Sequence, residues 1–237
     1  MAKIFGINGK LVGKQGAAVY SVKNGVQVVK QYNPIVFNPN TKRQALARAR
    51  FALASRWAIA LAKSNDIAWA LRKTGGKSGT NIQTSVMLKQ NGLITGTDPS
   101  ILQMAYDELV LAEGTLRQPS ITGLPTFTEP LRVGVPSVPA DDIMADLPSG
   151  YRVGVVWVLV CPDMQEATVR PVACDQTGLV PADTIAVPST WQGMNVHVFA
   201  YAKAVPESLL QIPTETYPWK YPAATSNSAY IGFGNIQ

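Results

Sequence analysis

Prolines divide the carboxy-terminal half of this sequence into short segments, and this limits the possible folds more than any other feature. Ten prolines lie between residues 119 and 188, separated by runs rich in valine and aromatic residues. Short apolar runs with regular turn signals are typical of an antiparallel sandwich. We therefore predict an α+β, mostly β chain, in which residues 119–237 form a sandwich like those of immunoglobulin or fibronectin domains.

The segment 194–204 carries the clearest strand pattern in this half. Its residues alternate between a face of small apolar side chains and a face of larger ones, namely Val196, Val198, Ala200 and Ala202 against Asn195, His197, Phe199, Tyr201 and Lys203. The segment 206–222 then interrupts the strands with four prolines. We expect a protruding loop there, with Tyr217 and Trp219 as exposed anchors for a partner.

Residues 40–73 read as one long helix that follows a hairpin. Thr41 and Gln44 have the spacing of a capping box, and the interior is rich in alanine. An apolar stripe lies between basic faces, formed by Leu46, Leu53, Trp57 and Leu61. Upstream, Asn24-Gly25 separates two strand-like runs, which predicts a β-hairpin.

The apolar residues of segment 77–118 do not recur with the period of a helix or of a strand. The segment 100–111 fits either an amphipathic helix or a strand, and we favour extended structure. We expect two domains, residues 1–118 as a basic hairpin-plus-helix assembly module and residues 119–237 as the sandwich.

Charge is divided sharply along the chain. Residues 1–90 hold 15 Lys or Arg and one acid, for a net charge of +14. Residues 91–237 hold six Lys or Arg and 14 acids, for a net charge of −8. Such a division indicates an electrostatic role, or two halves that attract each other. The predicted contact residues lie on the helix and at its end: Lys42, Arg43, Arg48, Arg50, Arg56, Lys63, Arg72, Lys73 and Lys77. They would neutralise phosphates without reading base sequence, pair with acidic surfaces of neighbouring subunits, or solvate the helix.

Patterns that carry catalysis are absent from the sequence. The segment 75–78 resembles the end of a phosphate-binding loop, but Leu71 stands where the pattern needs glycine. His197 lies within a strand with no motif around it, which favours a packing role. The acidic turn of Asp141, Asp142 and Asp146 lacks the spacing of a calcium loop. We therefore expect no enzyme, cofactor or metal site.

Two further interpretations concern the cysteines and the membrane. Cys161 and Cys174 lie in apolar or strand-like stretches, so we interpret both as small buried hydrophobic residues. No apolar run approaches the roughly 20 residues that a spanning helix needs. We expect no membrane span and no secretory signal.

The order of features resembles a family of uncharacterised proteins frequent in Bacteroidetes-type bacteria and their phages. The amino-terminal motif stands here as Asn38, Pro39, Thr41, Gln44, Arg48 and Phe51, followed by an Ile-Thr-Gly turn at residues 94–96. The carboxy-terminal motifs stand as Pro188, Trp191, Gly193, Val196, His197, Val198 and Phe199, and as Asn227, Ser228, Tyr230, Ile231 and Gly232. The segments 125–148 and 206–222 depart from the family pattern. The resemblance implies an architecture and a phage or prophage setting, but no catalytic residues.

These observations favour a phage virion structural protein that acts through subunit contacts. Its place would be capsid-associated, in a connector or in a tail, with copies of itself and other virion proteins as partners. We expect the protein to be made in the host cytoplasm and located in the virion. The alternative is a nucleic-acid-binding accessory protein that uses the basic helix without reading sequence.

Overall fold

The computed structural model describes residues 3–5, 10–23, 26–33, 40–72, 77–145, 147–175, 177–210 and 223–237. The chain divides into two compact units, residues 1–42 and residues 43–237. It is an α+β chain, mostly β, with antiparallel sheets, as the sequence predicted at this level.

The first unit is a four-stranded antiparallel sheet of neighbouring strands. The strands are β1 (Lys3–Phe5), β2 (Lys10–Gln15), β3 (Ala18–Lys23) and β4 (Val26–Gln31), in that spatial order. The pairing of β3 with β4 places Lys23 opposite Val26, which confirms the predicted hairpin. Its turn residues, Asn24 and Gly25, lie outside the described residues.

A second four-stranded antiparallel sheet forms the centre of the second unit. Its strands are β9 (Tyr151–Cys161), β10 (Glu166–Ala173), β13 (Asn195–Pro206) and β14 (Ala229–Asn235), in the order β10-β9-β13-β14. Successive residues of β9 point to opposite faces, and both Val155 and Val156 are fully buried. The sheet is therefore covered on both sides.

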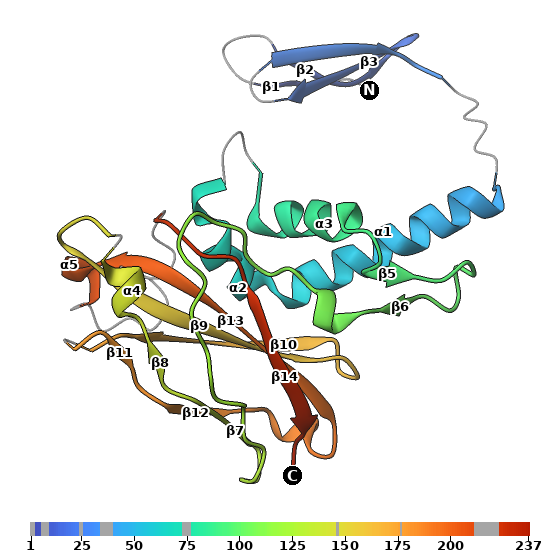
Figure 1. Ribbon diagram of the computed structural model, residues 1–237. Helices are drawn as coiled ribbons and strands as arrows, with labels where there is room; N and C mark the ends of the chain where they lie inside the picture. The colour runs from blue at the N-terminus through green and yellow to red at the C-terminus, as the bar shows by residue number, and fades with distance from the viewer. Residues whose placement is uncertain are drawn as a thin grey trace. The chain divides into compact units, whose positions relative to one another are not determined.

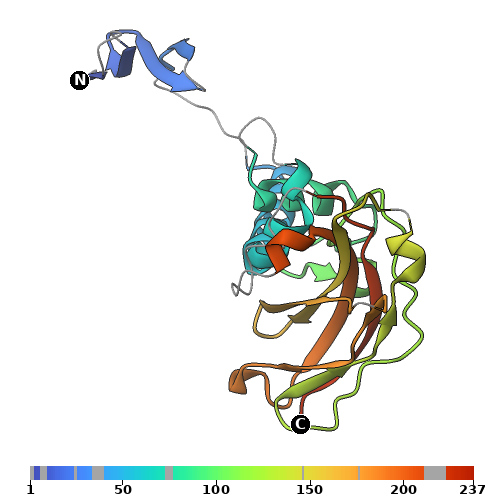
Figure 2. The same ribbon diagram turned by 90° about the vertical axis from the view of Figure 1, so that its left-hand side faces the viewer.

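Two short β-ribbons cover one face of this sheet. β7 (Arg132–Val135) pairs with β12 (Asp183–Ala186), and β8 (Val138–Pro139) pairs with β11 (Leu179–Val180), with α4 (Asp141–Met144) beside them. Val133 and Ile185 of the ribbons share a core with Trp157 and Val198 of the sheet. Figure 2 shows these ribbons on the side of the sheet opposite the helices.

Helices cover the other face (Figure 1). They are α1 (Lys42–Ala60), α2 (Ala62–Ala68), a 3-10 turn (Ala70–Arg72) and α3 (Gly79–Lys89). Trp57, Leu61 and Trp69 pack into one core with Val158 and Phe199 of the sheet. The remaining elements are β5 (Ile94–Thr95), β6 (Gln103–Met104), a 3-10 turn (Tyr106–Glu108), a 3-10 turn (Ser189–Trp191) and α5 (Glu207–Leu210).

The structure differs from the sequence predictions in three places. The long helix is interrupted at Leu61, where φ is −85° and ψ is 12°. The segment 100–111 forms only the short β6 and a 3-10 turn, so it is neither a regular strand nor a regular helix. The expected boundary after residue 118 falls inside the second unit, because the helices and the central sheet share one core.

Both cysteines are buried unpaired thiols, which confirms their interpretation as small core residues. Cys161 contacts Met194 and Cys174 contacts Met144, at sulfur–sulfur distances of 3.8 and 3.5 Å. In the part of the chain that the structure describes, no helix has both the length and the apolar character needed to cross a bilayer.

Candidate interaction surface on the helical layer

Helix α3 forms the outer ridge of the helical layer. It begins at Ser78, whose Oγ accepts a hydrogen bond from the amide of Asn81 at 3.2 Å. The absence of a side chain at Gly79 lets the helix start close to α2, because a Cβ there would lie 2.6 Å from the carbonyl oxygen of Asn65. This helix was not predicted from the sequence, although Ser78 is a good cap and Ile82 and Val86 have helical spacing.

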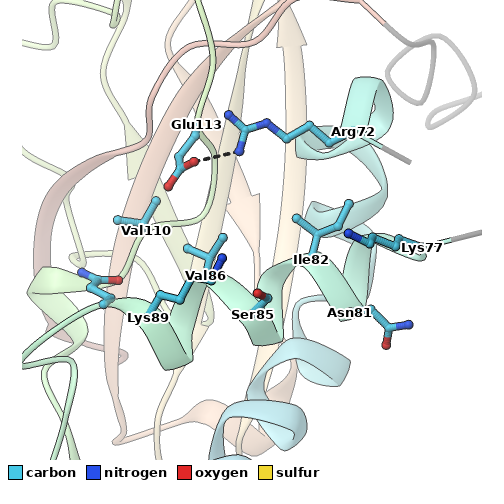
Figure 3. Close-up of a pocket in the computed structure, with 10 residues that line it drawn as sticks. Arg72, Lys77, Asn81, Ile82, Ser85, Val86, Lys89, Val110 and Glu113 are labelled. Carbon is cyan, nitrogen blue, oxygen red and sulfur yellow. Dashed lines mark hydrogen bonds and ion pairs between the residues drawn. The ribbon is translucent and has the colours of Figure 1, made fainter. Parts of the chain in front are cut away.

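One groove lies between α3 and the extended segment that holds Val110 and Glu113. We call it the basic groove; its volume is about 840 Å³, with Arg72, Lys77 and Lys89 as its cations. Ile82, Val86 and Val110 add apolar surface. Figure 3 shows Ile82 and Val86 extending from α3 toward the wall that carries Val110 and Glu113. The groove thus combines an apolar floor with a positively charged rim.

A chain of two hydrogen bonds, one buried and one partly buried, fixes the wall of the basic groove. Nε1 of Trp69 donates to Oε1 of Gln83 at 2.8 Å, and Nε2 of Gln83 donates to the carbonyl oxygen of Val110 at 2.7 Å. At the rim, Arg72 pairs with Glu113 at 2.8 Å and lies over the ring of Trp69. The groove is therefore held in shape by contacts among α2, α3 and the extended segment.

A second groove lies on the other side of α3, against α1. We call it the apolar groove; its volume is about 520 Å³ and its lining includes Phe51, Ser55, Ile59 and Leu88. Phe51, Ile59 and Leu88 are 57%, 67% and 42% exposed. The two grooves share residues of the α3 ridge, including Ser85, so they form one continuous surface.

The predicted basic residues do not all gather on one face. Nη2 of Arg50 donates to the carbonyl oxygen of Gly96 at 3.3 Å, and Nη1 of Arg56 donates to Oε1 of Gln165 at 3.3 Å. These two arginines therefore connect α1 to the β5–β6 ribbon and to the β9–β10 turn. Four others are exposed, and these are Lys42, Arg43, Arg48 and Lys63.

Among the predicted basic residues that the structure describes, only Arg72 and Lys77 line the same groove. Lys89 joins them there. It was not predicted as a contact residue, because the helix that positions it was not predicted. Lys73 lies outside the described residues, as do the predicted loop anchors Tyr217 and Trp219.

The single histidine is part of an aromatic cluster on the sheet. His197 Nδ1 and Tyr230 Oη are 3.1 Å apart, and the imidazole lies between the rings of Tyr106 and Phe233. Burial lowers the pKa of His197, while the charge of Asp107 acts in the opposite direction. The residue therefore packs on the strand surface, as the sequence indicated.

Among the residues that the structure describes, no group of three or more His, Cys, Asp or Glu side chains is placed to hold a metal ion. No family model, curated protein or solved structure matches this chain.

Proposed function

We propose that this chain is a non-catalytic structural protein of a phage particle that acts through contacts between subunits. The apolar groove is the observation that carries the proposal. The central sheet is already covered on both faces, yet Phe51, Ile59 and Leu88 stay exposed beside one another. Adjacent exposed apolar side chains over a rigid layer favour docking of another protein surface.

Charge favours a second copy of the chain as the occupant. Residues 1–90 carry a net +14 and residues 91–237 a net −8. Each copy therefore offers a neighbour a region of opposite sign, which favours head-to-tail association. Lys89 and Ser85 on the α3 ridge would form the polar rim of that contact, around the apolar groove.

The finer parts of the proposal follow from the sequence. We place the protein in the virion after synthesis in the host cytoplasm, as a capsid-associated, connector or tail component that also contacts other virion proteins. The immunoglobulin- or fibronectin-like sandwich expected for residues 119–237 stays a prediction. In its support, the ribbons β7–β12 and β8–β11 face the central sheet as a second layer.

Light scattering after size exclusion, at about 0.1 M salt and without nucleic acid, tests the assembly. We expect a defined homo-oligomer for the wild type and a monomer for the double variant Phe51→Ser, Ile59→Ser. Leu124→Ser is the matched control, because Leu124 is 76% exposed and does not line the apolar groove. A wild type that is monomeric at all concentrations, or a groove variant that assembles normally, contradicts the proposal.

Mass spectrometry of purified particles tests the virion setting. We expect the protein at a fixed copy number per particle, and its absence from particles would exclude a structural role there.

A second candidate is sequence-independent binding of nucleic acid by α1. The exposure of Arg43 and Lys63 favours it, because cations at the helix surface can reach phosphates. Reversal of Arg43 and Lys63 to Glu should then abolish retention on single-stranded DNA without changing the oligomeric state. Unchanged retention excludes this role of the helix.

A further inference from the structure

The amino-terminal sheet has one face that carries lysines. In the antiparallel pairing, Lys14 lies opposite Val19, and Val19 lies opposite Lys30. Directly paired residues of neighbouring strands point to the same face, so these three form one row across β2, β3 and β4. Tyr32 follows Lys30 by two residues, and its amide donates to the carbonyl oxygen of Ala17 at 2.7 Å, which continues the pairing.

An aromatic ring lies beside the two lysines. The Nζ atom of Lys14 is 3.5 Å from the centroid of the Tyr32 ring, which shows that both side chains occupy this face. Lys14 and Lys30 are exposed, and Tyr32 as a residue is 38% exposed. An ammonium group and a flat aromatic surface are therefore presented together to solvent.

The first unit contains no acid that could neutralise this face. Residues 1–42 include six lysines and no Asp or Glu. Lys14 and Lys30 are separated by two strand spacings, about 9.6 Å at about 4.8 Å per strand. This distance is within the Debye length of about 10 Å at 0.1 M salt, so the two positive potentials add.

The opposite face of the same strands differs in character. Gln15, Ala18 and Gln31 form the adjacent row, and Tyr20 lies opposite Val29. These residues carry no charge. The sheet therefore has one cationic face, which also carries an aromatic ring, and one uncharged face. Solubility alone would not require the lysines to lie on a single face.

We propose that the face of Lys14, Lys30 and Tyr32 binds single-stranded nucleic acid. The lysines would neutralise backbone phosphates, and the Tyr32 ring would stack on a base once a phosphate has drawn the Lys14 ammonium from it. Binding of a polyphosphate would require only the two lysines and would leave Tyr32 without a role. A protein partner is disfavoured because protein interfaces are depleted in lysine. The proposal does not depend on assembly through the apolar groove, and it assigns the binding to the sheet rather than to α1.

Fluorescence anisotropy of the full-length protein with a labelled oligothymidylate, over a series of salt concentrations, tests this site. Each single-strand phosphate contact contributes about −0.7 to the slope of log K against log salt. At 0.1 M salt one such contact therefore raises the binding constant by a factor of roughly five. The double variant Lys14→Gln, Lys30→Gln should therefore bind roughly 20-fold more weakly and lose about 1.4 of the slope. Arg43→Gln, Lys63→Gln removes the same charge from α1 and should change the affinity less than about twofold.

The stacking role has its own readout. Tyr32→Ser should weaken binding by about fivefold or more without changing the salt slope, because stacking releases no counterions, and Tyr32→Phe should bind like the wild type.

Three results would overturn the proposal. The first is no binding by the wild type at low salt. In the second, the α1 variant loses binding and the sheet variant keeps it. The third is competition by polyglutamate as effective as that by unlabelled oligothymidylate, which would indicate an acidic protein as the partner. Light scattering of the same lysine variant shows whether assembly is retained, so failure of this site is distinguished from failure of the assembly proposal.

Discussion

The guanidinium group of Arg72 lies 2.8 Å from the carboxylate of Glu113, and this ion pair joins the basic amino-terminal third to the acidic remainder of the chain. One positive charge of the basic part is thus paired with one negative charge of the acidic part within the same molecule. The pair lies at the rim of the basic groove, where each side chain is about half exposed.

This exposure limits how much the pair stabilises the fold. We expect a coupling free energy of about 0.2–1 kcal/mol between Arg72 and Glu113, because water and salt screen exposed charges. Urea unfolding of the wild type, Arg72→Gln, Glu113→Gln and the double variant measures it as a double-mutant cycle. The coupling should shrink at high salt, and a value above about 2 kcal/mol would contradict the expectation.

Gln83 should contribute far more to stability than that ion pair. Gln83→Met removes both of its hydrogen bonds, which leaves the buried Trp69 indole N–H without its partner and removes the donor to the Val110 carbonyl at the groove wall. We expect a loss of about 1–3 kcal/mol in the free energy of unfolding, measured in urea. Ser85→Ala, at an exposed position of the same helix, is the control and should stay within about 0.5 kcal/mol of the wild type.

The sequence predicted those elements whose pattern is local. The Asn24-Gly25 signal located the pair β3–β4, and the alternation from Val196 to Ala202 assigned the residues of this part of β13 to the correct faces. The predicted apolar stripe was correct at its carboxy-terminal end, since Trp57 in α1 and Leu61 just after it are buried, whereas Leu46 and Leu53 are partly buried. In each case a period of two or 3.6 residues determines which side chains are buried.

The layer that covers each face could not be predicted in the same way. In β9, Val155 and Val156 are both fully buried, so apolar residues lie on both faces of the strand. This pattern does not show that helices cover one face and ribbons the other. The sequence of an amphipathic helix shows that its apolar stripe is buried, but it does not show which element packs against that stripe. The basic groove depends on α3, which carries Lys89 and was not predicted, so the sequence led to Arg72 and Lys77 without their shared surroundings.

Both thiols should be unreactive in the folded protein. Burial raises the pKa of Cys161 and of Cys174, so little thiolate forms at neutral pH, and the surrounding core blocks access. We expect Ellman's reagent to detect two thiols only after unfolding, at the rate of unfolding. Rapid reaction of either thiol in the absence of denaturant would show that its part of the core opens.

The folded protein should lose stability as the pH falls below about 6.5, the ordinary pKa of histidine. Burial among aromatic rings lowers the pKa of His197 in the folded state, so between the two pKa values the unfolded chain binds a proton that the folded chain does not. Stability contributed by neutral His197 is therefore fully present above about 6.5 and declines toward the folded pKa. One proton changes the free energy by at most about 1.4 kcal/mol per pH unit, and by less here because the ring is only half-buried.

The variant His197→Gln isolates this effect, because the chain has one histidine. Urea unfolding of both proteins between pH 5.5 and 7.5 should show that the advantage of the wild type shrinks toward low pH, since carboxylates titrate equally in both. A constant difference between the two proteins would show that His197 does not titrate with folding. Tyr230→Phe removes the hydroxyl that lies 3.1 Å from Nδ1 and keeps the histidine, so its pH dependence should follow that of the wild type.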